Sequence, residues 1–352
     1  MTALKQLQQK LNQYKNIRSF LTTNPSNLNY LTKTTLFNVD NKGFGLITPT
    51  KVFLFVSPLI YEEVKLSLPN FVQTIALKNK PSFYRCLKML LINTHNLSLG
   101  FEENNLTWKQ HNELINKLKV KLIPTKNIIE KLRMTKAKTE LKKIKKAISL
   151  TKKSFQYIKE QLKPGKTEKE LAWQMEKFLR ESGADDLAFP IIIASGPNSS
   201  IPHYQTGNRK LQKNDLILID AGARINGYCA DITRTFFIGK PKPEWKKVYE
   251  IVKTTQQKAI RLINKEHSCS RARILLKGCQ IDKICRDYIK TKGYGRYFIH
   301  NTGHGLGLDI HELPIIGPKS KTILKPGMVF TIEPGIYIPE KFGVRIEDVV
   351  FI

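Results

Sequence analysis

The segment HNTGHGLGLDIHE, residues 300–312, places His300, His304 and His311 among three glycines. A helix would present the first two imidazoles on one face, as in zinc proteases of the H-E-x-x-H type. However, no glutamate follows His300, and each glycine would cost a helix about 1 kcal/mol. We therefore predict a glycine-bent strand or loop whose backbone approaches another group closely. The segment alone does not reveal what its histidines hold.

Four acidic residues occupy strand-like, apolar surroundings elsewhere in the chain. Asp220 ends the run 216–219, which is typical of a strand buried on both faces, and Asp231, Glu333 and Glu347 lie beside similar runs. An isolated buried carboxylate is very costly, so such groups are normally paired or bound to a metal. Each acid alone could be a strand-end cap or one half of an ion pair.

For the four acids together, a metal is the stronger interpretation. Only Arg234 and Arg345 lie near them in the sequence as cations. Two divalent cations would balance four carboxylates. Together with His304, the carboxylates form a mainly hard-oxygen donor set, suited to Mn(II), Co(II), Fe(II) or Zn(II).

The elements that must position these residues fall into two regions. Residues 20–125 alternate short strands and helices, which indicates an α/β domain. We expect two strands in 43–58 joined at residues 48–50, a helix in 81–95, and strands at 97–101 and 120–124. We predict His95 and His111 to be surface residues.

Residues 126–166 are rich in lysine but are not predicted to be a disordered tail. Apolar residues recur there at helical spacing, so the lysines would cover the solvent face of a helix that ends at Pro164-Gly165. Thr167-x-x-Glu170 is a capping box for a further helix running to Gly183. The apolar stripe consists of Leu141, Ile144, Ile148, Phe155, Ile158 and Leu162.

Strand patterns dominate the remainder. Asn226-Gly227 predicts a hairpin between strands at 216–223 and 227–239. The full set of expected elements is strands at 188–196, 216–223, 227–239, 297–301, 328–333, 336–338 and 343–351, and helices at 244–265 and 278–292.

Composition excludes several classes of protein. With 352 residues, 41% of them hydrophobic and 25% charged, the chain is an ordinary globular sequence long enough for two domains. No apolar run reaches the length of a membrane span, and the N-terminus lacks the apolar block of a secretory signal. Five cysteines without a C-x-x-C pair indicate free thiols in a reducing cytoplasm. The net charge of +30 is carried mostly by lysine, so we attribute it to compositional bias and expect no specific nucleic-acid partner.

The order of the candidate ligands resembles a known family. Their contexts, IDAGARINGYCADITRTF, HNTGHGLGLDIHE, GMVFTIEPGIY and GVRIEDVV, are similar to those of the pita-bread metallopeptidases. PHYQTGNRKLQKNDLILID also places His203 where the family has a histidine. The resemblance is strong over residues 130–352, and TTNPSNLNYLT (22–32) is weakly similar to the creatinase-type N-terminal domain.

The resemblance implies an α+β fold: a smaller α/β creatinase-like N-terminal domain over residues 1–125, then a pita-bread catalytic domain over 126–352 with a curved antiparallel sheet. It also implies two divalent metal ions, most readily manganese, with cobalt, zinc or iron as alternatives. Asp220 would chelate one ion and Asp231 and Glu347 would bridge both, while His304 and Glu333 would complete the second site.

The same resemblance assigns roles around the metals. A metal-bridging hydroxide would attack the peptide, with Glu333 as proton shuttle. His203, His300 and His311 would face the substrate, and Arg345 would orient the neighbouring acids. We also expect Thr233 to hydrogen-bond Asp231, with which it shares strand parity.

The histidines and the N-terminal domain favour the proline-peptidase branch of the family. Within that branch we expect an Xaa-Pro aminopeptidase, with an Xaa-Pro dipeptidase (prolidase) as the alternative. A catalytically silent relative that binds protein or nucleic acid is a remote third hypothesis. The expected partners are proline-containing peptides and a second copy of the chain in a homodimer.

Overall fold

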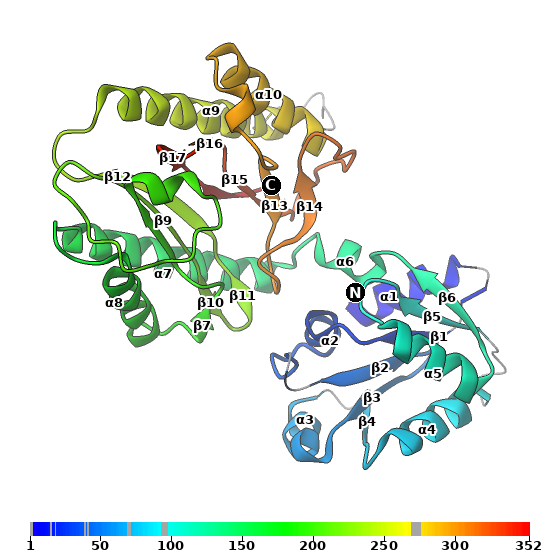
Figure 1. Cartoon of the computed structure of the whole chain (residues 1–352). Helices are drawn as coiled ribbons and strands as arrows, with labels where there is room; N and C mark the ends of the chain where they lie inside the picture. Colours follow the sequence, from blue (N-terminus) through cyan, green and yellow to red (C-terminus); the bar gives the residue numbers. More distant parts are fainter. Residues whose placement is uncertain are drawn as a thin grey trace. The chain divides into compact units, whose positions relative to one another are not determined.

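The computed structural model describes residues 3–14, 16–17, 19–38, 40, 42–68, 72–92, 98–268 and 276–352. The chain divides into two compact units, Met1–Arg133 and Met134–Ile352 (Figure 1). His95 and Cys269, together with residues 270–275 of the segment 264–280, lie outside the described residues.

The first unit is built on one mixed sheet. Its strand order is β4-β3-β2-β1-β5-β6, and only β2 runs against its neighbours. The predicted turn at residues 48–50 joins β2 to β3, and the strands expected near 97–101 and 120–124 are present. The strands are β1 (Ser19–Thr22), β2 (Gly43–Ile47), β3 (Val52–Val56), β4 (Val72–Ala76), β5 (Ser98–Glu102) and β6 (Lys121–Thr125).

In the described residues of this unit, six α-helices accompany the sheet. Helices α4 and α5 pack together and close an apolar core over it with Phe55 and Leu87 at its centre, and His111 on α5 is half-buried against Trp108. The helices are α1 (Ala3–Asn12), α2 (Pro25–Thr32), α3 (Tyr61–Ser67), α4 (Lys80–Ile92), α5 (Trp108–Leu118) and α6 (Ile128–Arg133).

The boundary between the units lies eight residues beyond the expected position. Asn27 on α2 donates to Glu130 over 2.7 Å and accepts from Arg133 over 2.9 Å, so α6 belongs to the first unit. The lysine-rich composition of residues 126–166 is shared by α6 and the long helix after it. Composition therefore could not show where one unit ends.

The second unit begins with two helices that follow the sequence prediction. Helix α7 (Lys138–Gln161) buries Ile144, Phe155 and Ile158. Helix α8 (Glu168–Glu181) starts with the predicted capping box at Thr167. The lysines of α7 lie mostly on its exposed side.

The predicted hairpin is present as two successive strand pairs. Strands β9 (Leu216–Ala221) and β12 (Ile232–Phe237) pair antiparallel, with β8 (Ile192–Ser195) on the other edge of β9. Between them, β10 (Ala223–Ile225) and β11 (Tyr228–Cys229) form a tight hairpin, and β7 (Asp186–Leu187) pairs with β10. Asn226 and Gly227 both have positive φ, 48° and 80°, as a primed turn requires.

The remaining strands differ from prediction in three places, one of which is β14, a strand that was not predicted. Residues 297–301 are not a strand: a short 3-10 helix covers Gly295–Tyr297 and the strand lies instead in the glycine-rich segment. The single strand expected at 343–351 is two strands in different sheets, broken at Ile346-Glu347. The strands are β13 (Gly303–Gly305), β14 (Glu312–Ile316), β15 (Val329–Ile332), β16 (Gly335–Ile338), β17 (Phe342–Arg345) and β18 (Asp348–Phe351).

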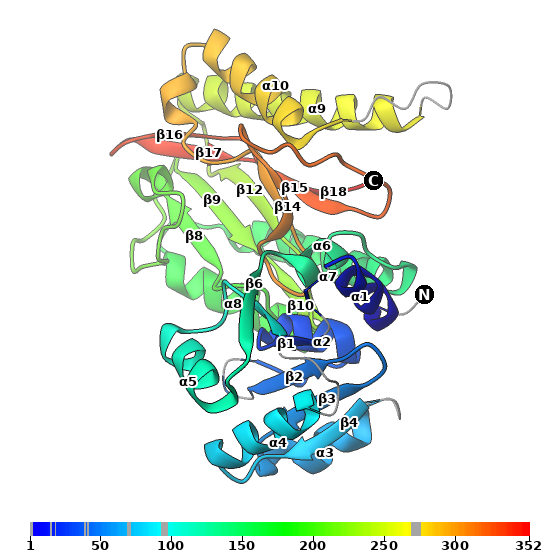
Figure 2. The same cartoon turned by 90° about the vertical axis from the view of Figure 1, so that its right-hand side faces the viewer.

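Helices enclose the sheets of the second unit from two sides. Figures 1 and 2 show α7 and α8 on one side of its strands and α9 (Pro243–Ser268) and α10 (Gly278–Thr291) on the other. Each helix pair closes its own apolar core against the strands. The strands between these two cores carry the candidate functional residues.

Candidate metal centre

Three predicted ligands converge although they come from distant parts of the chain. Ligand atoms of Asp231, His304 and Glu347 all lie within 4.8 Å of one another. His304 Nε2 lies 3.5 Å from Asp231 Oδ2 and 3.3 Å from Glu333 Oε1. Asp220 belongs to the same cluster. Burial raises the pKa of Asp231, Glu333 and Glu347, and the nearby charge of Asp220 raises all three pKa values further.

Strand ends place these carboxylates. Asp231 immediately precedes β12, Glu333 immediately follows β15, and Glu347 lies in the break between β17 and β18. Asp220 is the exception, since it lies within β9 opposite Thr233. Strands from three sheets thus direct these acids into one space.

The glycines around His304 have a packing role. A side chain at Gly303 would place its Cβ 1.9 Å from the Thr331 carbonyl oxygen, and one at Gly305 would lie 2.2 Å from the Leu313 oxygen. Strand β13 can therefore lie between β14 and β15 only with glycine on both sides of His304. The prediction of a glycine-bent strand with close backbone approach is confirmed.

The buried oxygens fit divalent cations. Among the described residues, Asp220 Oδ1, Asp231 Oδ1 and Glu347 Oε1 are buried and make no hydrogen bond. All three parent residues are less than a tenth exposed. Buried polar atoms are normally paired. Three orphaned carboxylate oxygens in one cluster are the donor set expected of a site for hard or borderline cations.

The electrostatics of the metal-free protein support the same reading. Burial, then the neighbouring Glu347 and Asp220, raise the pKa of Asp231 well above its usual range. Burial likewise raises the pKa of Glu333 to about 8, and burial followed by the charge of Glu333 raises that of Glu347. Carboxylates in such a cluster repel one another unless protons or cations neutralise them.

Arg345 is fixed among the acids, as predicted. Its Nη2 donates to Asp220 Oδ2 over 2.7 Å and its Nε donates to the Thr233 hydroxyl over 3.0 Å. That hydroxyl in turn donates to Glu347 Oε2 over 2.6 Å. The expectation that Thr233 would bond Asp231 was therefore wrong. Strand parity did not reveal that Glu347, from a different sheet, lies closer to this hydroxyl.

The three histidines that were expected to face the substrate lie around the cluster. His300 Nδ1 is 4.0 Å from Glu333 Oε2, and the His311 ring meets that of His304 edge-on with centroids 4.3 Å apart. His203 is exposed. Burial lowers the pKa of both His300 and His311, and the neighbouring His203 contributes to the same lowering. Burial lowers the pKa of His300 and of His304 to about 4, so both are neutral at pH 7.

Tyr337 is a site residue that sequence reasoning missed. Its hydroxyl accepts from Arg345 Nη1 over 2.8 Å and lies 3.0 Å from His300 Nε2. The side chain is 2% exposed. The available signal was a tyrosine within the otherwise apolar strand β16.

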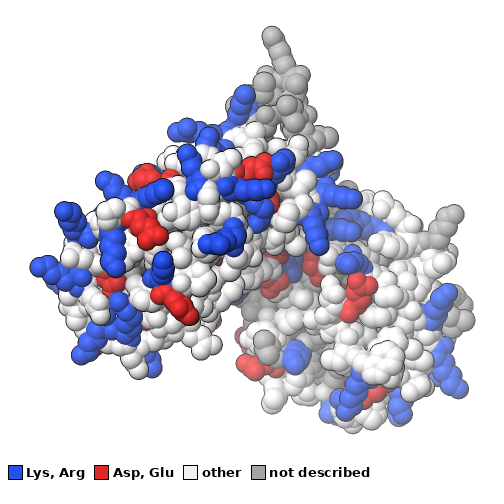
Figure 3. Space-filling model, turned by 45° about the horizontal axis from the view of Figure 1, so that its top comes forward, with Lys and Arg blue, Asp and Glu red and all other residues white. Residues whose placement is uncertain are grey.

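The charged side chains on one face of the protein are of both signs. On the face drawn in Figure 3, lysine and arginine side chains are interspersed with acidic and uncharged ones, without a continuous basic band. Among the described residues, no helix combines the length and apolarity needed to span a bilayer.

Comparisons with known proteins agree with this geometry. Residues 142–352 match the profile of metallopeptidase family M24, and residues 4–135 match that of the creatinase/prolidase N-terminal domain. The Xaa-Pro dipeptidase of Pyrococcus furiosus is 37% identical over 311 residues, which span 88% of this chain and 84% of that protein.

Solved structures also match almost the whole chain. The Xaa-Pro dipeptidase from Bacillus anthracis superposes with a TM-score of 0.90 at 32% identity, covering 99% of this chain and 94% of that one. The X-Pro aminopeptidase from Thermotoga maritima superposes with a TM-score of 0.86 at 30% identity, with the same coverage. The expected creatinase-like domain followed by a pita-bread domain is confirmed.

Proposed function

This chain belongs to metallopeptidase family M24, and on that premise we propose that it is a dinuclear metallopeptidase that hydrolyses Xaa-Pro dipeptides. The observation that carries the proposal is the convergence of Asp231, His304 and Glu347 within 4.8 Å, with Glu333 and Asp220 beside them. A silent relative would be expected to have lost at least one of these five residues.

Asp220, Asp231, His304, Glu333 and Glu347 would hold the two cations. When bound, these would polarise the scissile carbonyl and lower the pKa of the attacking water. Glu333 is suited to accept the proton of that water and pass it to the leaving amine, because its carboxylate lies between His300 and His304 at the edge of the cluster. His203, His300 and His311 can hydrogen-bond the substrate carbonyl and the developing oxyanion.

The dipeptidase proposal replaces the aminopeptidase expected from the motifs. The motifs are shared by both activities and could not separate them. A relative and a solved structure that match most of the chain are named as Xaa-Pro dipeptidases, and they support the dipeptidase activity. The structural likeness to an X-Pro aminopeptidase keeps aminopeptidase activity as the second candidate.

Incubation of the manganese-loaded protein with Ala-Pro and with Ala-Pro-Ala tests the choice. We expect release of alanine and proline from the dipeptide and little cleavage of the tripeptide. Rapid cleavage of the tripeptide would instead identify an aminopeptidase, and cleavage of neither would refute both activities. Manganese as the native metal, a homodimer and a cytoplasmic location remain predictions of the family resemblance.

A further inference from the structure

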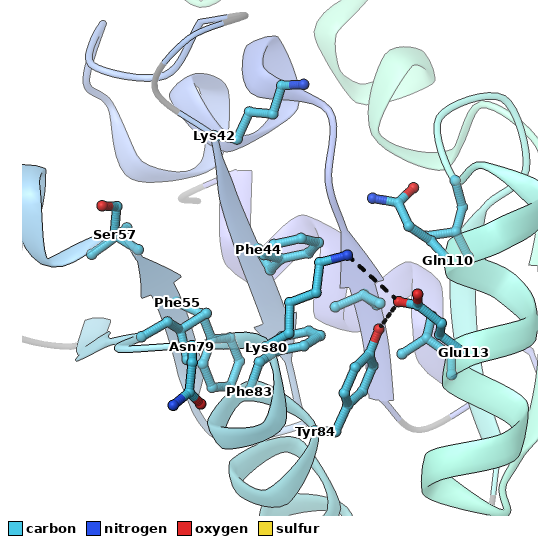
Figure 4. A pocket seen from close by; sticks show the side chains of 15 residues that line it. Lys42, Phe44, Phe55, Ser57, Asn79, Lys80, Phe83, Tyr84, Gln110 and Glu113 are labelled. Carbon is cyan, nitrogen blue, oxygen red and sulfur yellow. Dashed lines mark hydrogen bonds and ion pairs between the residues drawn. The ribbon is translucent and has the colours of Figure 1, made fainter.

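The first unit contains a cavity that the proposed reaction does not use. It has a volume of about 290 Å³ and lies between α4, α5 and the sheet (Figure 4). Its lining includes Leu21 on β1, Val56 at the end of β3 and Leu77 directly after β4. In open α/β sheets, ligands bind in crevices at the carboxyl ends of the parallel strands. This cavity lies at that edge.

The floor of the cavity is aromatic. Phe83 meets Phe44 with ring centroids 4.7 Å apart and Phe55 with centroids 5.2 Å apart. Four leucines complete the apolar lining, Leu21 on β1, Leu114 on α5, and Leu77 and Leu106 in loops. Ligand pockets are typically mostly apolar and measure about 300–1,000 Å³. A cavity at the lower limit of that range fits a ligand of the size of one amino acid.

Charged groups of both signs stand around the floor. Figure 4 shows the Tyr84 hydroxyl and the Lys80 ammonium directed at Glu113. Tyr84 donates to Glu113 Oε2 over 2.6 Å, and Lys80 Nζ lies 3.9 Å from the same oxygen. Glu113 Oε1 makes no hydrogen bond within the described part of the chain. The Tyr84 hydrogen bond lowers the pKa of Glu113, which keeps this carboxylate charged at neutral pH.

We propose that this cavity binds an apolar α-amino acid in its zwitterionic form. The aromatic floor would receive the side chain, Glu113 Oε1 would accept from the ammonium group, and Lys80 with Lys42 at the rim would attract the carboxylate. Amines without a carboxylate would meet two lysines without compensation, and acids without an amine would leave Glu113 unused. The proposal concerns binding alone and does not depend on the reaction at the carboxylate cluster.

Calorimetric titration of the intact chain with L-phenylalanine tests the proposal. The matched probes are 2-phenylethylamine, which lacks the carboxylate, and 3-phenylpropanoate, which lacks the amine. We expect one saturable site for L-phenylalanine and binding at least about tenfold weaker for each analogue, because each loses a charge-assisted contact.

Two substitutions locate the site. Glu113→Gln should weaken L-phenylalanine about tenfold and remove its advantage over 3-phenylpropanoate. Leu106→Trp should fill the cavity and abolish binding. Glu62→Gln, on the exposed surface of α3 away from the cavity, should change nothing. If Leu106→Trp does not fold, the Glu113→Gln titration decides alone.

The proposal is overturned if L-phenylalanine shows no saturable binding at millimolar concentration. It is equally overturned if binding is unchanged in Glu113→Gln, which would place the ligand elsewhere, including at the carboxylate cluster. Since heat of binding is measured without turnover, neither result bears on whether the protein cleaves Ala-Pro.

Discussion

The Arg345 guanidinium donates to Asp220 Oδ2 over 2.7 Å, while Oδ1 of the same carboxylate is buried and makes no hydrogen bond among the described residues. Arg345 is itself held by the Thr233 and Tyr337 hydroxyls and by the Pro202 carbonyl. The carboxylate is therefore oriented through one oxygen and keeps the other available for a cation.

Substitution of this arginine should reduce metal affinity with the five ligands intact. Arg345→Lys keeps the charge but cannot bond Asp220, Thr233 and Tyr337 together. Removal of such supporting contacts costs about 10- to 100-fold in metal affinity or activity. Isothermal titration with Mn(II) measures the loss. Arg180→Lys, which alters an exposed ion pair with Glu176, is the control and should bind as the wild type does.

The Thr233 hydroxyl should matter for the same reason. Thr233→Val removes the donor to Glu347 Oε2 without a large change in volume, so we expect about tenfold weaker metal binding. Thr255→Val is the matched control, because Thr255 is also fully buried but bonds only a carbonyl of its own helix. Equal effects of both substitutions would mean that general packing, not orientation of Glu347, explains the loss.

The stability of the metal-free protein should fall as pH rises above 6.5. Glu333 has its pKa raised from 4.5 to about 8, so the folded state retains a proton that the unfolded state has released, and stability is lost as pH rises through about 8. His300 and His304, with pKa lowered to about 4, act in the opposite direction only below 6.5.

Urea unfolding of chelator-treated protein between about pH 6.5 and 8.5 measures this slope. Glu333→Gln should flatten it, and added Mn(II) should stabilise the wild type most at the alkaline end. A metal-free stability that is constant or rises over this interval would contradict the assignment of buried, mutually repelling carboxylates.

Tyr337 should affect catalysis more than folding. Tyr337→Phe removes the hydroxyl that joins Arg345 to His300, and leaving buried groups without this partner costs about 1–3 kcal/mol. We expect kcat/KM for Ala-Pro to fall at least about tenfold with the metal content retained. Tyr228→Phe is the control, since its buried hydroxyl bonds Glu140 outside the cluster. A fall of the same size in both variants would remove Tyr337 from the site.

The sequence supported the ligand set because each ligand lies in a strongly patterned stretch. A carboxylate beside an apolar run, as at Asp220 or Glu333, is informative alone, since burial of a charge requires a partner. The capping box at Thr167 and the Asn226-Gly227 turn were predictable because their chemistry is local.

Interactions between distant segments were not predictable in this way. The sequence around Glu347 predicts one continuous strand, but the structure breaks it there into β17 and β18. The break is explained only by pairing with distant segments, because β17 pairs with β16 and β18 pairs with β15. The partner of Thr233 and the role of Tyr337 depend on how separate sheets meet. The unit boundary at Arg133 depends on hydrogen bonds to Asn27 across more than a hundred residues.

The most direct test of the metal centre is an anomalous difference map from crystals grown with Mn(II), recorded near the manganese absorption edge. We expect two peaks per chain, both among Asp220, Asp231, His304, Glu333 and Glu347. No peak there, or manganese bound only elsewhere while Asp220 is still paired with Arg345, would contradict it.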